Sequence, residues 1–161
     1  MAAVDFFLKL DGIKGESTDD KHKGEIDVES WSWGATNASS GPTGGGHGVG
    51  KVSVQDLHFV HKLDKASAQL FQLCSNGHHV AKGTLVCRKA GKDPLEYLKL
   101  DLEHVFVTSI SVGGHSGDTL PTEQVSLSFA KFHLKYYPQK PDGSGDTAQE
   151  LKMDVAAHKI G

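Results

Sequence analysis

Apolar and polar residues alternate with the two-residue period of β-strands along most of this 161-residue chain. The alternation predicts strands over 4–13, 25–34, 51–60, 83–90, 95–112 and 123–137, and a short last strand over 151–155. Between the third and fourth of these strands, Leu70, Leu73 and Cys74 recur at helical spacing. We therefore predict a mostly β fold with one α-helix.

The predicted helix has sequence signals at both ends. Asp64 or Ser67 can cap its first turn, because their side-chain oxygens accept hydrogen bonds from free backbone N–H groups. The pair Asn76-Gly77 can end it in the left-handed conformation, which glycine adopts without strain. These signals place the helix between Asp64 and Gly77.

Four of the predicted strands change their apolar side partway along. In the run 95–112, Leu98 and Leu102 are even-numbered, whereas Val105 and Val107 are odd-numbered. Since the side-chain period of a strand is two, each change needs a bulge or a sharp bend. Strands that cross into a facing sheet explain this pattern, and we predict a compact two-sheet β-barrel flanked by the helix. The alternative is that half of each run is buried on both faces.

The segment 35–50, ATNASSGPTGGGHGVG, interrupts the strands and contains six of the 19 glycines. Its small side chains bury too little surface to offset the entropy of ordering, so we expect a mobile loop. The spacing from Gly45 to Lys51 matches the G-x-x-x-x-G-K of a phosphate-binding loop. That chemistry needs a hydroxyl residue where Val52 stands and a helix where a strand is predicted. We therefore expect no nucleotide site.

Composition excludes several classes of function. The net charge is −3 and Arg88 is the one arginine among 17 basic residues, which disfavours base readout and nucleic-acid binding. No apolar stretch reaches the ~18–20 residues of a membrane span, so we expect no direct membrane insertion. The start MAAVDFFLKLDG has a short apolar run, interrupted by Asp5, and predicts no signal peptide. We expect a protein made in the cytoplasm, which a dedicated apparatus exports folded if it leaves the cell.

The residues that carry chemistry do not form a recognisable catalytic or metal site. His58 and His61, three apart on a predicted strand, lie on opposite faces, and we interpret the ten histidines as scattered surface residues. Cys74 and Cys87 fit as buried apolar side chains, with a disulfide between them as the other option. The sequence GHSG at 114–117 lacks the pattern of a nucleophile elbow. We therefore expect no enzyme activity, no metal and no cofactor.

The strongest local signal is the sequence SWSWG at 30–34. On a strand, Trp31 and Trp33 share one face, where they fit a core or a subunit interface. Ser30 and Ser32 share the other face, which is small and polar and suits a wet surface such as a channel wall. Core tryptophans with serines that merely face solvent are an equally good interpretation of the pattern alone.

Several stretches together resemble the haemolysin-coregulated protein (Hcp) family, the tail-tube component of bacterial type VI secretion systems. In order, they are VDFFLKLDGIKGES, EIDVESWSWG, GKVSVQDLHF, KLDKAS followed by CSNGHH, RKAG followed by EYL, and YYPQKPDG. Each stretch alone is weak, but the ordered set is specific. The likeness runs from Val4 to Gly143 and gives no guide to the tail 146–161. We expect residues 1–161 to form a single domain of this kind.

The resemblance implies a homo-hexameric ring with an open central channel. Such rings stack into a tube that a contractile sheath drives out of the cell, and the channel carries effector proteins. Baseplate and spike components of the secretion apparatus are further implied partners. Carried over residue by residue, the family's channel wall falls on Ser30 and Ser32. The family's extended loop, which reaches a neighbouring subunit or ring, falls on Ala38, Ser39, Ser40, Gly41, Pro42, Thr43, Gly44, Gly45, Gly46, His47 and Gly48.

We therefore expect a secreted, non-enzymatic tube subunit and effector carrier. The alternative is a specialised Hcp-like effector protein with a bound metal or another activity, although the chain after Gly143 is too short for a fused toxin domain. A monomeric carbohydrate-binding sandwich is a third hypothesis. It would need exposed aromatic platforms, whereas the 12 aromatic residues lie mostly on faces predicted to be buried.

Overall fold

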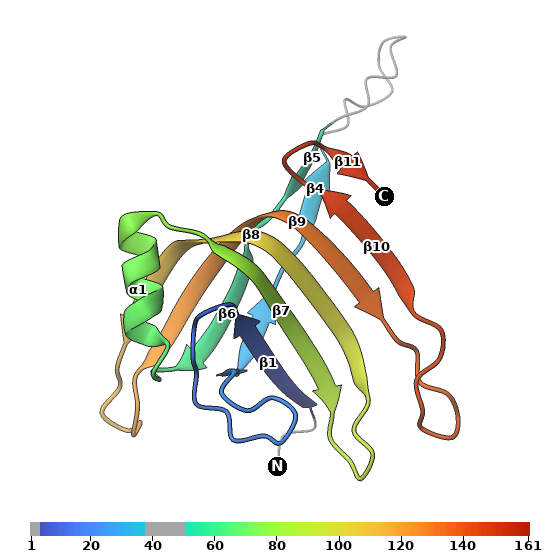
Figure 1. Cartoon of the computed structure of the whole chain (residues 1–161). Helices are drawn as coiled ribbons and strands as arrows, with labels where there is room; N and C mark the ends of the chain where they lie inside the picture. The colour runs from blue at the N-terminus through green and yellow to red at the C-terminus, as the bar shows by residue number, and fades with distance from the viewer. Residues whose placement is uncertain (1–3, 38–50) are drawn as a thin grey trace.

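The computed structural model describes residues 4–37 and 51–161, which form eleven strands and one helix (Figure 1). In chain order these are β1 (Val4–Leu10), β2 (Ile26–Val28), β3 (Ser30–Ser32), β4 (Ala35–Asn37), β5 (Val52–Val54), β6 (Leu57–Lys62), α1 (Ser67–Asn76), β7 (Val80–Lys89), β8 (Glu96–Gly113), β9 (Thr122–Tyr136), β10 (Gln149–Asp154) and β11 (Lys159–Ile160). The predicted strands are all present, but 25–34 and 51–60 are each divided in two. The expected loop 38–48 lies outside the described residues.

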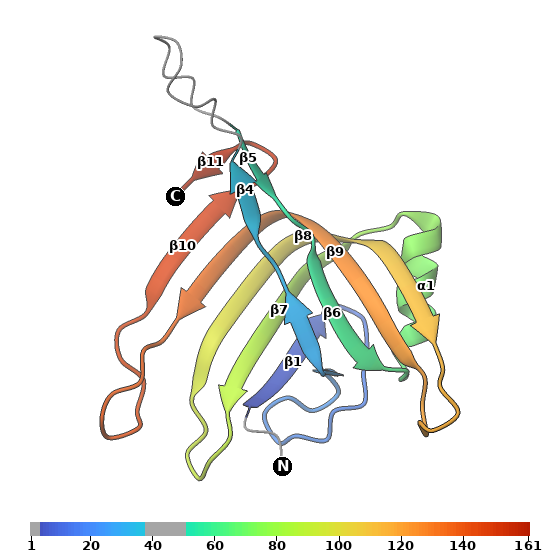
Figure 2. The same ribbon diagram turned by 180° about the vertical axis from the view of Figure 1, so that it is seen from behind.

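Antiparallel pairing joins nine strands into one large sheet, in the order β11-β10-β9-β8-β7-β1-β2, with β6 on β9 and β3 on β6. At Glu29 the chain leaves β1 and joins β6, so the strands curve around one core without a continuous ladder between β2 and β3 (Figures 1 and 2). The mostly β class with one helix is confirmed, but the sheet of the expected barrel is not closed. β4 and β5 form a separate two-stranded sheet that extends away from the core.

The changes of apolar side predicted for β8 and β9 lie on one line, which continues across β7, where no change was predicted. Across this line, the buried positions of each strand are three residues apart instead of two. The crossing pairs are Val80 and Gly83 on β7, Leu102 and Val105 on β8, and Phe129 and Phe132 on β9. His104, at the line, has a φ of 57°, in the left-handed region that non-glycine residues rarely adopt. Burial on both faces is excluded here, because Glu103 and Lys131 on the other side are exposed.

Neither residue predicted to cap helix α1 stands at its N-cap. Ala66 stands at the N-cap and makes no side-chain capping bond. Asp64 instead accepts a hydrogen bond from the Ala66 N–H at 2.8 Å, and the Ser67 hydroxyl accepts one from the Asp64 N–H at 3.0 Å. The predicted end is confirmed: Gly77 has a φ of 71° and donates its N–H to the Leu73 carbonyl.

The core lies between the curved sheet and α1, which packs against β8. Its largest fully buried apolar side chains are Phe59, Leu8, Leu10, Ile26, Leu57, Leu70, Leu85, Leu100, Leu102 and Leu127. Each such side chain contributes about 1.5–3 kcal/mol through its removal from water. Cys74 and Cys87 are both free thiols, and burial raises the pKa of Cys87 to about 11. The two cysteines therefore form no disulfide that would stabilise the fold.

Candidate functional site

Ser30 and Ser32 lie on β3, and both are exposed. Between them, Trp31 points to the core side and makes an edge contact with Phe6, with ring centroids 6.3 Å apart. Trp33, just past β3, packs edge-on against Phe132 at 4.8 Å. The predicted division of the SWSW sequence into a tryptophan side and a serine side is therefore confirmed.

The two serines belong to a larger polar surface that crosses four strands. Register places two rows of side chains next to each other on the side turned away from the core, over β3, β6, β9 and β8 in turn. The rows are Ser30, Val60, Gln124 and Ser111, and then Ser32, His58, Ser126 and Ser109. We call these eight residues the serine face. Apart from the His58 imidazole, none of its side chains is ionisable.

Hydrogen bonds hold the second row of the serine face in place. His58 Nδ1 lies 2.6 Å from the Ser126 hydroxyl, which joins β6 to β9 through side chains as well as backbone. Thr108, beside this row, donates its hydroxyl to Asp56 at 2.6 Å and contacts the Ser126 carbonyl at 3.2 Å. The result is a surface of mostly short polar side chains, held by hydrogen bonds on the β6–β9 ladder.

Sequence reasoning identified two of these eight residues. The remaining serine-face residues of β9 carried the same signal, because Gln124 and Ser126 alternate with the buried Val125 and Leu127. What the sequence lacked was the register that brings β9 beside β6. The other predicted site residues, 38–48, lie outside the described part of the chain.

Beyond the line of bends, the outward side of the same sheet is charged. Charged or ionisable outward residues of β7, β8, β9 and β10 there include Lys82, Lys99, Asp101, Glu103, Lys131, His133, Lys135, Glu150 and Lys152. We call these residues the charged face. Lys135 Nζ lies 3.3 Å from Asp101, and His133 Nε2 lies 3.1 Å from Glu150. Opposite charges on neighbouring strands are therefore paired.

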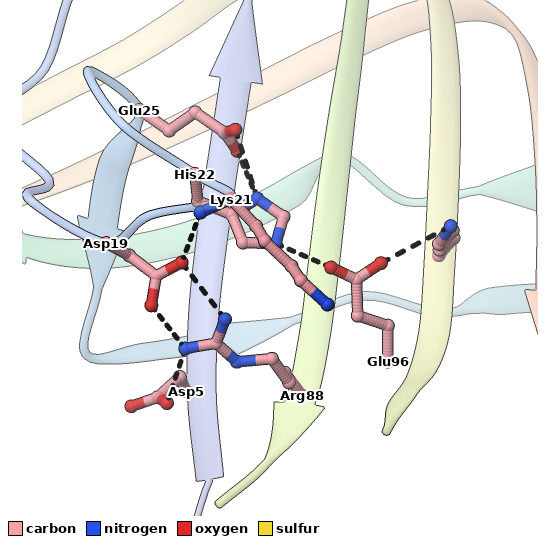
Figure 3. A network of polar contacts seen from close by, with 8 residues as sticks. Asp5, Asp19, Lys21, His22, Glu25, Arg88 and Glu96 are labelled. Carbon is pink, nitrogen blue, oxygen red and sulfur yellow. Dashed lines mark hydrogen bonds and ion pairs between the residues drawn. The ribbon is translucent and has the colours of Figure 1, made fainter. Parts of the chain in front are cut away.

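Next to the charged face, the loop between β1 and β2 covers an ion cluster (Figure 3). Arg88 on β7 donates to Asp19 at 2.6 and 3.0 Å and to Asp5 at 3.2 Å, and its guanidinium carbon lies 4.9 Å from the Phe7 ring centre. Hydrogen bonding by Arg88 lowers the pKa of Asp19 to about 2. The arginine is 8% exposed, so this cluster binds the loop to the sheet and leaves little of the cation for a ligand.

His22 forms the second half of this cluster (Figure 3). Its ring stacks on Phe7 at 4.3 Å, Nδ1 lies 3.0 Å from Glu25, and Nε2 lies 2.6 Å from Glu96. Lys99 contacts the same Glu96 carboxylate at 3.3 Å. Burial raises the pKa of Glu96, but the hydrogen bonds from His22 and Lys99 outweigh it and the net shift is downward.

The interpretation of all histidines as surface residues is wrong for two of them. His22 is 7% exposed and His61 is fully buried, and each contacts carboxylates. His58 and His61 do lie on opposite faces of β6, as predicted. Within residues 4–37 and 51–161, no three or more His, Cys, Asp or Glu side chains gather in a way that could hold a metal ion. No helix in that part of the chain is long and apolar enough to cross a membrane.

Comparisons with known proteins agree with this fold. A family model described as "Type VI secretion system effector, Hcp" matches residues 7–136. Protein hcp1 of Pseudomonas aeruginosa is 47% identical over 145 residues, which cover 89% of this chain and 90% of that protein. A solved type six secretion system protein matches with a TM-score of 0.92 and 28% identity, over 99% of this chain and 100% of that one. Hcp1 from Salmonella typhimurium matches with a TM-score of 0.80 and 38% identity, over 99% and 100% of the two chains.

Proposed function

Because the chain belongs to the Hcp family of type VI secretion proteins, we propose that it is a structural subunit of the secreted tail tube. Six copies form a ring, rings stack into a tube, and the channel carries effector proteins without enzymatic activity of the subunit. The sheath, baseplate and spike of the apparatus are its further partners. In this proposal Ser30 and Ser32, with the rest of the serine face, line the channel. Residues 38–48 reach a neighbouring subunit or ring.

One observation carries the ring: the apolar core side of the sheet continues past the part that the chain itself covers. Across β8, β9, β10 and β11 one row consists of Leu102, Phe132, Met153 and Ile160. Exposure along this row is 1, 6, 7 and 71%. The next row ends in Leu151, which is 41% exposed, and Tyr136 near it is 45% exposed. We call Tyr136, Leu151 and Ile160 the apolar strip.

The apolar strip favours a partner that is another copy of the same chain. It lies at the end of the sheet opposite α1 in both views (Figures 1 and 2). If it contacts a different patch of the next copy, the same contact repeats around a circle and closes a ring. Covering these side chains removes apolar area from water, which stabilises association by ~25 cal/mol per Å² of apolar surface.

Electron microscopy of the purified protein tests the ring. We expect ring-shaped particles by negative stain, and we expect Leu151→Asp to give monomers by light scattering at tens of micromolar. Lys152→Asp is the matched control, because the neighbouring side chain points to the other face of β10 and should leave rings intact. Both positions are exposed, so thermal unfolding of the monomer should change little. Wild-type protein that stays monomeric at this concentration would disprove the ring.

The channel role is tested separately by secretion. Replacing Ser32 with arginine puts a bulky charge on the serine face and should leave rings intact while lowering the amount of effector secreted with them. Ser116→Arg is the control, because Ser116 is an exposed serine in the turn between β8 and β9. Equal effector levels in the Ser32 variant and the wild type would remove Ser32 from the channel wall.

The proposed role of residues 38–48 needs its own variant. Deleting Ala38 to Gly48 should leave single rings in solution and abolish stacked tubes. The β4–β5 pairing, Ala35 with Val54 through Asn37 with Val52, stays in this variant and fixes where the shortened connection begins. Tubes of normal length from the deletion variant would contradict this role.

A further inference from the structure

A buried histidine joins three elements beneath the serine face. His61, near the end of β6, is fully buried, and Glu123 at the start of β9 is 1% exposed. Nε2 of the histidine lies 2.7 Å from Glu123 Oε1. The two residues are also direct partners in the β6–β9 ladder, so backbone and side chains join the strands at one place. The function proposed above does not use this pair.

A second carboxylate faces the other nitrogen of the same ring. Asp64 Oδ2 lies 3.6 Å from His61 Nδ1, and the Asp64 side chain is 10% exposed. The other Asp64 oxygen accepts the Ala66 N–H at 2.8 Å, at the residue that stands at the N-cap of α1. Nδ1 is buried and has no hydrogen-bond partner at this distance. The imidazole therefore sits between the end of β6, the start of β9 and the turn that begins α1.

The charged side chains that face the His61 ring are carboxylates. β9 supplies Glu123 and the turn before α1 supplies Asp64. Lys62, next to His61 on β6, points outward, with its Nζ 3.8 Å from Glu29 and 3.1 Å from the Thr122 hydroxyl. On β2, Asp27 has a raised pKa, chiefly through burial and in part through the charge of Asp64. Within the described residues, His61 is therefore the one basic group that pairs with Glu123 and Asp64.

Burying two carboxylates beside a neutral ring is costly, because buried charge must be paired. A neutral imidazole has a single N–H and serves one carboxylate, whereas an imidazolium donates from both nitrogens and carries the balancing charge. Burial lowers the pKa of His61, but the nearby Asp64 carboxylate and the hydrogen bond and charge of Glu123 outweigh it and raise the pKa overall.

We propose that His61, Glu123 and Asp64 form a proton-binding joint that holds β6, β9 and the start of α1 together only while the imidazole is protonated. Loss of the proton leaves Glu123 and Asp64 without their cation and loosens the β6–β9 ladder. The same ladder positions His58 and Ser126 of the serine face, three residues away on each strand. Protonation is thereby linked to the order of that face.

The sign of the pH dependence follows from the raised pKa. The folded protein binds the proton more tightly than the unfolded chain, in which histidine has a pKa of ~6.5. The stabilisation is fully present below about pH 6.5 and is lost as the pH rises through the folded-state value. In that window the unfolding equilibrium constant rises by up to about tenfold per pH unit for one proton.

Unfolding of the wild type and of His61→Gln between pH 5.5 and pH 9 tests the joint. Wild-type stability should fall as the pH rises through the neutral range, and the fall should be reduced in the variant by the amount due to one proton. His133→Gln is the matched control, because this partly exposed histidine also contacts a glutamate, and it should keep the wild-type slope. His22 is present in all three proteins, so its contribution cancels in the comparison.

Nitrogen NMR of histidine-labelled protein provides a readout that does not depend on the stability of a variant. We expect one imidazole to show two protonated nitrogens at pH 7, and its titration to move to lower pH in Glu123→Gln. Asp64→Asn should move it in the same direction by a smaller amount, because its carboxylate is farther from the ring. A His61 ring that is neutral at pH 7, or a wild-type pH slope retained by His61→Gln, would overturn the proposal.

Discussion

β8 and β9 carry both the serine face and part of the charged face on their outward sides. Near the start of β9, Gln124 and Ser126 are neutral, whereas Lys131, His133 and Lys135 farther along the same strand are charged or ionisable. Apart from the buried Glu123, the inward side of both segments is apolar, with Val125 and Leu127 in one and Phe132 and Leu134 in the other. The main difference between the two regions is therefore what they present to their surroundings.

This difference shows two ways in which a sheet can present a polar surface. On the charged face, opposite charges on neighbouring strands form ion pairs, as Lys135 and Asp101 illustrate. On the serine face, short hydroxyl side chains present hydrogen-bonding groups without charge, so no counter-ion is needed. A surface of the first kind depends on its pairing, and one of the second kind depends on staying uncharged.

Removing Arg88, the cation of the cluster beside the charged face, should have the largest effect. Arg88→Met leaves Asp5 and Asp19 without their partner and should cost about 3 kcal/mol of unfolding free energy. Denaturant titration measures the loss. Lys89→Met is the control on the same strand, because Lys89 contacts Gln139 through one exposed hydrogen bond. Equal costs for the two variants would show that the pairing does not stabilise this region.

Adding a charge to the serine face should have the next largest effect. Ser126 is 8% exposed beside His58, so Ser126→Lys should cost about 2 kcal/mol, because the new ammonium loses water there and displaces the hydrogen bond. His133→Lys makes the same change on the charged face of the same strand and should cost less than about 0.5 kcal/mol. The comparison of the two regions fails if both variants unfold at the same denaturant concentration.

Acid should weaken the cluster beside the charged face before it affects the serine face. The pKa of Asp19 is lowered from 3.8 to about 2, so its stabilising contribution is present above pH 3.8 and is lost as the pH falls toward 2. Because this carboxylate is partly exposed, we expect about 1 kcal/mol after solvent screening. Asp19→Asn should lack this part of the acid-induced loss, as measured by unfolding at pH 2 to 5. Asp20→Asn should keep it, and a loss of the same size in all three proteins would refute the assignment.

The smallest effect should come from a single pair within the charged face. Lys135→Met breaks the contact with Asp101, whose side chain is 39% exposed, and should cost less than about 0.5 kcal/mol. The difference from the wild type should shrink further in about 1 M salt, because added ions screen exposed charges. A cost that persists unchanged in high salt would mean that Lys135 acts through packing of its aliphatic chain.

The strands of both regions were predictable because the signal is local. The run predicted over 95–112 is β8 at Glu96–Gly113, since alternation and flanking turn residues are both read from adjacent positions. The changes of apolar side predicted in β8 and β9 were also correct, and the line of bends through His104 accounts for them. In 25–34 and 51–60 the predicted change falls where each run is divided into two strands. The division at Glu29 was not predicted, because it depends on which partner each half of the segment joins.

The candidate surface was predictable only in part. The exposure of Ser30 and Ser32 follows from their alternation with Trp31, but Gln124 and Ser126, which continue the same rows beyond β6, come from a strand almost one hundred positions away in the chain. Burial of His61 could not be read from the sequence, because an ionisable residue at an inward position needs a partner, and Glu123 becomes one only when β6 meets β9. The alternation of apolar and polar residues does not tell which distant strands pair, or in which register.

The passage of the chain from β1 to β6 at Glu29 has a consequence for synthesis. β7 is the second partner of β1, since Val4 pairs with Lys89, and β9 is the second partner of β6, since Leu57 pairs with Leu127. A nascent chain that ends after β8 would therefore leave β6 and β8 each with an unpaired edge, and such edges are templates for aggregation. The ladder that joins β6 to the rest of the large sheet thus forms only once β9, which ends at Tyr136, has been made.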